Sequence, residues 1–195
     1  MKLSKSRSIA DEISHYVVSK IAFLKGIEEQ GAGKGMLAEL RRGLGKSPGE
    51  MPELWGLIFD VMPEELLGMN RMSYAEWTVY TVLTLYALHC QGADYEVNTQ
   101  GQKLGVAAAK LVESEDDIQR VTNRFHLVVT STTLEELSYH MRGMIQLLKA
   151  KNIALDYASL SKDLYLFNIS DAADTVKLNW GRDFYREIYK KTGGK

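Results

Sequence analysis

The sequence predicts an all-α fold, built as two small helical bundles with short loops. Apolar residues recur at spacings of three and four along most of the chain, which is the period of an amphipathic helix. No segment shows the alternation of apolar and polar residues expected of a strand. Ser73 followed by Glu76, and Thr133 followed by Glu136, are typical of helix N-termini with capping boxes. These observations indicate about eight to nine helices.

The elements follow one another closely along the chain. The first helix carries an apolar stripe that includes Ile13, Val17 and Ile21, and a short helix with two arginines follows it. Proline suits the first turn of a helix, so Pro52 predicts the start of a third helix. The predicted helices span residues 8–29, a short segment within 31–57, 53–61, 74–90, 104–112, 115–130, 134–149, 156–167 and 171–190.

The helix over residues 74–90 is apolar on nearly all sides. A helix of this kind lies in the core of a protein or in a membrane. Thr78, Thr81, Thr84 and His89 interrupt it, and this favours a buried core helix over a membrane span. We therefore expect it at the centre of the N-terminal half.

Residues 91–103 form the predicted boundary between the two halves. This segment is polar, contains two glycines and has no apolar period, so it predicts a mobile loop. The expected organisation is an N-terminal helical domain over residues 1–92, a loop or linker over 93–103, and a C-terminal helical domain over 104–195.

Composition bounds the class of protein. The net charge of −1 and the 45% hydrophobic content are ordinary for a folded chain. The N-terminal sixteen residues contain no apolar segment of signal-peptide length. The single cysteine, Cys90, forms no internal disulfide and is expected in the core, which suits a reducing cytoplasm. We expect a cytoplasmic protein with no membrane association.

Motifs for catalysis or cofactor binding are missing. The stretch GAGKG at residues 31–35 resembles a phosphate-binding loop, but Glu28 and Gly35 stand where that motif needs glycine and Ser or Thr. The four histidines, at positions 15, 89, 126 and 140, have no metal-ligand spacing. Paired carboxylates lie mostly near helix ends, and several of them lie at N-termini, where a negative charge interacts favourably with the helix dipole. The sequence therefore predicts no catalytic residues, no metal and no cofactor.

Basic residues on helix faces are the positive signal. In the short helix Leu37, Leu40 and Leu44 share one face, which predicts a core contact. Lys34 and Arg41 fall beside that face. Arg42 points further round, toward solvent.

Three later helices also carry cations. Arg120 and Arg124 are one turn apart, with no acid in the following turn. Arg142 and Lys149 are two turns apart beside an apolar seam. On the last helix three cations step by four residues, but nearby acids are expected to mute that face. Any one of these sets serves most often as a soluble surface; several sets converging on one surface would instead bind nucleic-acid phosphates.

These segments resemble the CasB family, the small subunit of the type I-E CRISPR surveillance complex, Cascade. The resemblance covers most of residues 34–188 and depends on the order and spacing of its segments. Those segments are MLAELRRG at 36–43, KLGVAAAKL at 103–111, RVTNRF at 120–125, the pattern L-x-x-H-M-R-x-M-I-x-L-L ending at 148, IALDY at 153–157 and WGRDFY at 180–185.

The resemblance implies an all-helical, non-enzymatic subunit that lies against the other Cascade subunits and a second copy of itself, near the guide RNA. It also implies contacts to the target strand and the displaced strand of an R-loop, consistent with base pairing reading the sequence. By position, Arg41, Arg42, Arg124 and Arg142 match basic positions of the family, and Lys177 takes one before the last helix.

This chain departs from the family pattern in two ways: its charge is nearly neutral, and Gly143 replaces a helix arginine. Two alternatives stay open. One is a helical scaffold or adaptor that contacts only protein, and the other is a small helical hydrolase, for which the ligand spacing is missing.

Overall fold

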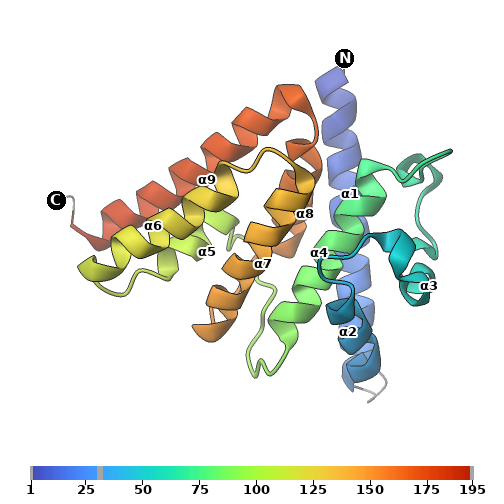
Figure 1. Cartoon of the computed structure of the whole chain (residues 1–195), viewed down its shortest axis with the longest axis horizontal. Coiled ribbons are helices and arrows are strands. Elements are labelled where there is room, and N and C mark those ends of the chain that lie inside the picture. Colours follow the sequence, from blue (N-terminus) through green and yellow to red (C-terminus); the bar gives the residue numbers. More distant parts are fainter. Residues whose placement is uncertain (1, 30–32, 194–195) are drawn as a thin grey trace.

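The computed structural model describes residues 2–29 and 33–193, and within them the chain is entirely helical apart from turns and loops. Figure 1 shows α1, α4 and α8 in the middle, with α5, α6 and α9 on one side and α2 and α3 on the other. The all-α prediction is confirmed. The helices are α1 (Lys2–Glu29), α2 (Gly33–Arg42), α3 (Trp55–Phe59), α4 (Tyr74–Cys90), α5 (Leu104–Lys110), α6 (Glu115–Val129), α7 (Leu134–Ala150), α8 (Tyr157–Phe167) and α9 (Ser170–Lys191).

The N-terminal half shows where the predicted boundaries were wrong. Helix α1 begins at Lys2 rather than at residue 8, because the polar residues before the apolar stripe contain no helix breaker. The expected helix over 53–61 consists of the end of the 3₁₀ turn η2 (Pro52–Leu54) followed by α3, and another 3₁₀ turn, η1 (Pro48–Glu50), precedes both. A third 3₁₀ turn, η3 (Glu64–Leu66), precedes α4.

Helix α4 lies at the centre of the structure, as its composition predicts. Every residue from Thr78 to His89 is buried. The Ser73 hydroxyl accepts a hydrogen bond from the Glu76 amide at 3.0 Å, and the Glu76 carboxylate accepts one from the Ser73 amide. This capping box fixes the start of the helix, as the sequence predicts.

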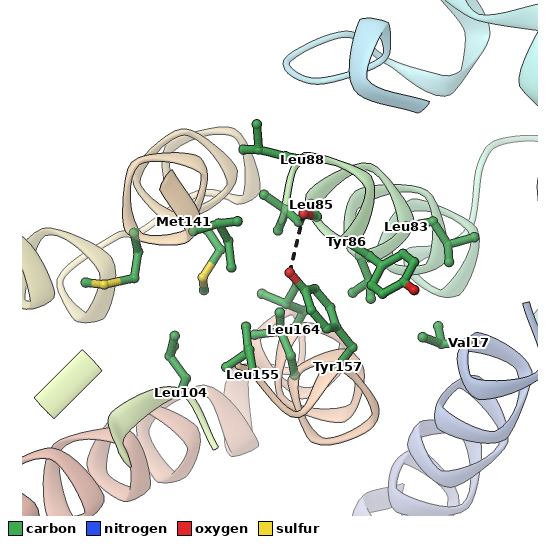
Figure 2. Packing of buried hydrophobic residues seen from close by; sticks show 14 of the residues in the cluster. Val17, Leu83, Leu85, Tyr86, Leu88, Leu104, Met141, Leu155, Tyr157 and Leu164 are labelled. Atoms are coloured by element: carbon green, nitrogen blue, oxygen red, sulfur yellow. Dashed lines mark hydrogen bonds between the residues drawn. The ribbon is translucent and has the colours of Figure 1, made fainter. Parts of the chain in front are cut away.

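The core continues from the N-terminal half into the C-terminal half. Figure 2 shows Tyr157 of α8 between residues of α4 and α8, with Val17 of α1 and Met141 of α7 nearby. The Tyr157 hydroxyl donates a hydrogen bond to the Leu85 carbonyl of α4 at 3.3 Å. Helix α1 also packs along α8. The division into domains over 1–92 and 104–195 stays a prediction, and side-chain packing runs across it.

Residues 91–103, the predicted loop, lie outside any helix, and their contacts do not fit a mobile linker. The Leu155 amide donates to the Val97 carbonyl at 2.9 Å, and the Thr99 amide donates to the Leu155 carbonyl at 3.2 Å. The Gly101 amide donates to the Asp156 carboxylate at 2.7 Å. Backbone groups of this segment therefore hold it against the segment that precedes α8.

The single cysteine lies at the edge of the core. Cys90 is half-buried and packs against the core; burial raises the pKa of its thiol to about 11. Gly31 and Ala32 of the glycine-rich stretch lie outside the described residues. None of the described helices combines the length and the apolar character needed to cross a bilayer.

Candidate nucleic-acid interface

The eight predicted basic residues fall into three groups in the structure. Arg41, Lys149 and Lys177 make hydrogen bonds with other segments of the chain. Arg42 and Arg120 face acidic side chains on their own helices. The remaining three make no hydrogen bond or ion pair with any described residue: Lys34, Arg124 and Arg142.

Arg41 is a structural residue rather than an exposed cation. It is half-buried, and its guanidinium donates to the Ala87 carbonyl at 3.4 Å. Ala87 lies in the last turn of α4, where carbonyls lack a partner within the helix and a positive charge is favourable. Arg41 therefore fixes the end of α2 to the end of α4, and the prediction that it faces a ligand has no support from its contacts.

Two lysines are engaged in the same way. The Lys177 ammonium donates to the Ser131 carbonyl at 2.9 Å and lies 5.1 Å from the centre of the Phe167 ring. Lys149 donates to the Gln91 side-chain oxygen at 3.1 Å. A hydrogen-bonded ammonium has fewer donors free for a phosphate, so these two lysines fit the predicted interface poorly.

Arg120 has an acidic partner on its own helix, which the sequence analysis did not predict. Asp117, one turn before it, lies 2.5 Å from its guanidinium. This hydrogen bond is the main reason that the pKa of Asp117 is lowered to about 2, helped by the amides of Glu113 and Ser114. Arg42, in contrast, is exposed and lies 4.0 Å from Glu39. This separation is longer than that between Arg120 and Asp117, so Glu39 offsets the charge of Arg42 less.

The predicted muting of the cations on α9 is confirmed for Arg186 and Lys190, whereas Arg182 donates to the Asn179 side-chain oxygen at 3.4 Å. Arg186 lies 3.7 Å from Asp183, and Lys190 lies 2.5 Å from Glu187. Both pairs have the spacing of neighbouring turns. This helix therefore presents little net positive charge.

Arg124 and Arg142 lie on neighbouring helices. Both are exposed, Arg124 on α6 and Arg142 on α7, and these two helices pack against each other. A methyl group placed on Gly143 would lie 3.9 Å from the Arg124 guanidinium carbon. Arg124 of the adjacent helix thus borders the space next to Gly143.

Arg142 also borders a cavity of about 330 Å³ between the α2–η1 turn, α4 and α7. The turn contributes Lys46, a cation that the sequence analysis did not predict to be part of a site. The turn is held in place because the Tyr80 hydroxyl donates to the Gly43 carbonyl at 2.8 Å and because Gly45 adopts a φ of 79°. The lining residues are Leu44, Gly45, Lys46, Ser47, Trp77, Tyr80, Thr81, Thr84, Glu135, Ser138, Tyr139 and Arg142.

The eight cations stay a prediction, and the structure places two of them, Arg124 and Arg142, on adjacent helices. We define the α6–α7 surface by Arg124, Arg142 and Lys46, together with the exposed Tyr139. Tyr139 precedes Arg142 by three residues, so helical spacing alone places both on one face. Lys46 carries no comparable signal, because only tertiary packing brings its turn to α7.

Comparison with known proteins identifies the family. The family model described as CRISPR-associated protein Cse2 matches residues 36–185, which is more than half of the chain. The chain belongs to the Cse2 family. The crystal structure of CasB from Thermobifida fusca has 30% sequence identity and a TM-score of 0.76, over 89% of this chain and 97% of that chain.

Two further Cse2-family structures share the fold. M. ruber CasB has 28% identity and a TM-score of 0.63, over 80% of this chain and 87% of that chain. CasB from Thermus thermophilus has 22% identity and a TM-score of 0.66, over 87% and 97%, and at this identity the likeness concerns the fold alone. Among curated proteins there is no match. The resemblance to the CasB family is confirmed, and the chain is CRISPR-associated.

Proposed function

We propose that this Cse2-family chain is a non-catalytic, cytoplasmic subunit of type I-E Cascade that contacts nucleic-acid backbone through the α6–α7 surface. The observation that supports this most directly is that Arg124 and Arg142 lie on two helices that pack against each other. Both are exposed and neither has an acidic partner among the described residues. Unpaired arginines bind phosphate with bidentate hydrogen bonds and without regard to sequence.

The proposed ligands are the target strand and the displaced strand of the R-loop, held near the guide RNA. Protein contacts to opened strands help to balance the energy of strand exchange. Lys46 extends the surface toward α2, where Arg42 and Lys34 are exposed. The proposed protein partners are other Cascade subunits and a second copy of this chain.

Replacing both unpaired arginines tests this function. For single-stranded DNA the logarithm of the binding constant falls with the logarithm of salt concentration by about 0.7 for each phosphate contacted. The double variant Arg124→Ala/Arg142→Ala should therefore bind more weakly and lose about 1.4 from this slope. Fluorescence anisotropy of a labelled oligonucleotide, measured at several salt concentrations, gives both quantities.

The matched control is Arg186→Ala, which removes an arginine whose charge already faces Asp183 at 3.7 Å. It should leave the slope nearly unchanged. The same variants, assembled into Cascade, should show the same ranking in R-loop formation on a target duplex. Equal binding by the double variant and by the control would reject the site.

A scaffold that contacts only protein is the second candidate. The exposed apolar side chains of the segment between α3 and α4 favour it: Val61 is 80% exposed and Met69 is 97% exposed. Apolar groups this exposed are typical of protein contacts when they lie close together. Normal assembly into the complex, with no photocrosslink from the α6–α7 surface to either DNA strand, would favour this candidate over the first.

A further inference from the structure

The cavity between the α2–η1 turn, α4 and α7 has features that phosphate binding alone does not need. Its volume of about 330 Å³ is at the lower end of the range for small-ligand pockets. Three aromatic residues line it: Trp77, Tyr80 and Tyr139. Bare phosphate contacts need cations and not aromatic walls, so the aromatic lining points to a flat, apolar ligand group.

The three rings differ in how free they are. The Tyr80 hydroxyl is used by the Gly43 carbonyl, so this ring is a fixed wall. Trp77 is half-buried, and its indole N–H makes no hydrogen bond with any described residue. Tyr139 is 73% exposed at the rim, and its ring meets that of His140 in a T-shape at 5.2 Å rather than in a parallel stack.

The charges at the rim complement a nucleotide. Arg142, on α7, has no acidic partner among the described residues. Lys46 lines the same cavity from the α2–η1 turn. Hydrogen bonds from Ser47 are the main reason that the pKa of Glu50 is lowered, and the charge of Lys46 adds to their effect. Glu135 is the one carboxylate in the lining, and carboxylates accept hydrogen bonds from exocyclic amino groups of bases.

We propose that this cavity receives one base of a single DNA strand whose phosphates contact Arg142 and Lys46. The base stacks on Tyr139 and enters toward Trp77. This inference depends on the proposed function, because it assumes that a DNA strand follows the α6–α7 surface. It adds a base-dependent contact to a surface otherwise expected to contact only phosphate.

Two oligonucleotides of equal length separate the base from the phosphates. One is a deoxyadenosine 12-mer, and the other has abasic tetrahydrofuran residues in place of its central nucleosides. Stacking of a base on an aromatic side chain changes affinity by about tenfold. The full chain should therefore bind the abasic strand about tenfold more weakly at about 50 mM salt, measured by fluorescence anisotropy.

The variant Tyr139→Ala should bind both strands equally well, because only the stacking is lost. Tyr189→Ala is the matched control: that tyrosine is 66% exposed on α9, away from the cavity, and the tenfold difference should persist. Circular dichroism checks that both variants are folded. With 2-aminopurine at the central position, base fluorescence should be quenched by the parent chain and by Tyr189→Ala, and less by Tyr139→Ala.

Each outcome separates the two proposals. Equal, salt-dependent binding of both strands by the parent chain would overturn the base pocket and leave the phosphate contacts standing. A tenfold difference that survives in Tyr139→Ala would place the base elsewhere and overturn this assignment. Failure to bind either strand would reject the proposed function and the pocket together. A larger base-dependent difference with the matching RNA strands would overturn the assignment to DNA.

Discussion

His89 lies fully buried at the end of α4, between two tyrosine hydroxyls. Its Nδ1 is 2.9 Å from the Tyr157 hydroxyl, and its Nε2 is 3.0 Å from the Tyr95 hydroxyl. Burial is the main reason that the pKa of His89 is lowered to about 4, and the nearby charge of Lys149 adds to it. The histidine is therefore neutral in the folded protein and connects α4, α8 and the loop between the halves.

This lowered pKa predicts a loss of stability in mild acid. The unfolded chain takes up the proton near the ordinary pKa of 6.5, and the folded chain takes it up only near 4. The free energy of unfolding should thus be unaffected by His89 above pH 6.5 and should fall between pH 6.5 and 4. The expected loss is about 3 kcal/mol.

Urea denaturation of the parent chain and of His89→Gln, at several pH values, isolates this contribution. The comparison is needed because Asp163 acts in the opposite direction: burial raises its pKa to about 6, so protonating it favours the folded state as the pH falls. The difference between the two proteins should shrink by about 3 kcal/mol from pH 7 to pH 4. A difference that does not change with pH would contradict the buried neutral histidine.

At the scale of elements, α5 lies in close contact with α9. A methyl group placed on Gly105 would lie 2.3 Å from the Trp180 carbonyl oxygen and 2.8 Å from the Phe184 amide nitrogen. Both atoms belong to the helix backbone, which cannot rotate away as a side chain can. Only glycine lets α5 lie this close to α9.

Gly105→Ala should therefore lower the free energy of unfolding by at least 2 kcal/mol, because the two helices must move apart. The matched control is Gly181→Ala on α9, where a methyl group would meet nothing within 4 Å. That variant should be more stable than the parent by about 0.5–1 kcal/mol, since alanine favours a helix interior. Chemical denaturation measures both, and equal effects of the two variants would contradict the packing argument.

For the whole molecule, the continuity of the core determines how the chain unfolds. Helix α1 packs on α8, and α4 packs on both α7 and α8. Tyr157 joins α8 to α4 through the Leu85 carbonyl. Neither half closes its apolar surface without the other.

We therefore expect one cooperative unfolding transition rather than two. Helix content by circular dichroism and tryptophan fluorescence should give the same midpoint and the same slope in urea. The tryptophans report on both halves, since Trp55 and Trp77 lie in the N-terminal half and Trp180 lies in α9. Two separated transitions would instead support independent domains over residues 1–92 and 104–195.

The net charge of −1 does not indicate the local positive charge of the α6–α7 surface. Most cations of this chain face a carboxylate or a carbonyl, as Lys162 does with Asp11 at 2.6 Å and Lys177 with Ser131. Paired charges nearly cancel at a distance. Arg124 and Arg142 are unpaired and lie on adjacent helices that pack together, so an anionic strand is expected to bind there.

Secondary structure could be predicted closely from the sequence because local patterns determine it. Helix α4 begins where Ser73 caps it, and α7 begins at Leu134 behind Thr133. The exceptions lie where proline and glycine are dense: Leu44, expected on the helix with Leu37 and Leu40, follows the end of α2. There the turn depends on the contact between Gly43 and Tyr80, which are far apart in sequence.

The sequence by itself determined the helical class, the central position of α4 and the family of this chain, because helical period, capping and segment order are local properties. Only the tertiary structure decided which cations are free. Arg41 and Lys177 look like Arg124 and Arg142 in the sequence, yet the former donate to carbonyls of distant segments. A cation's partners depend on which helices meet, so no local pattern separates a structural arginine from one that is open to a phosphate.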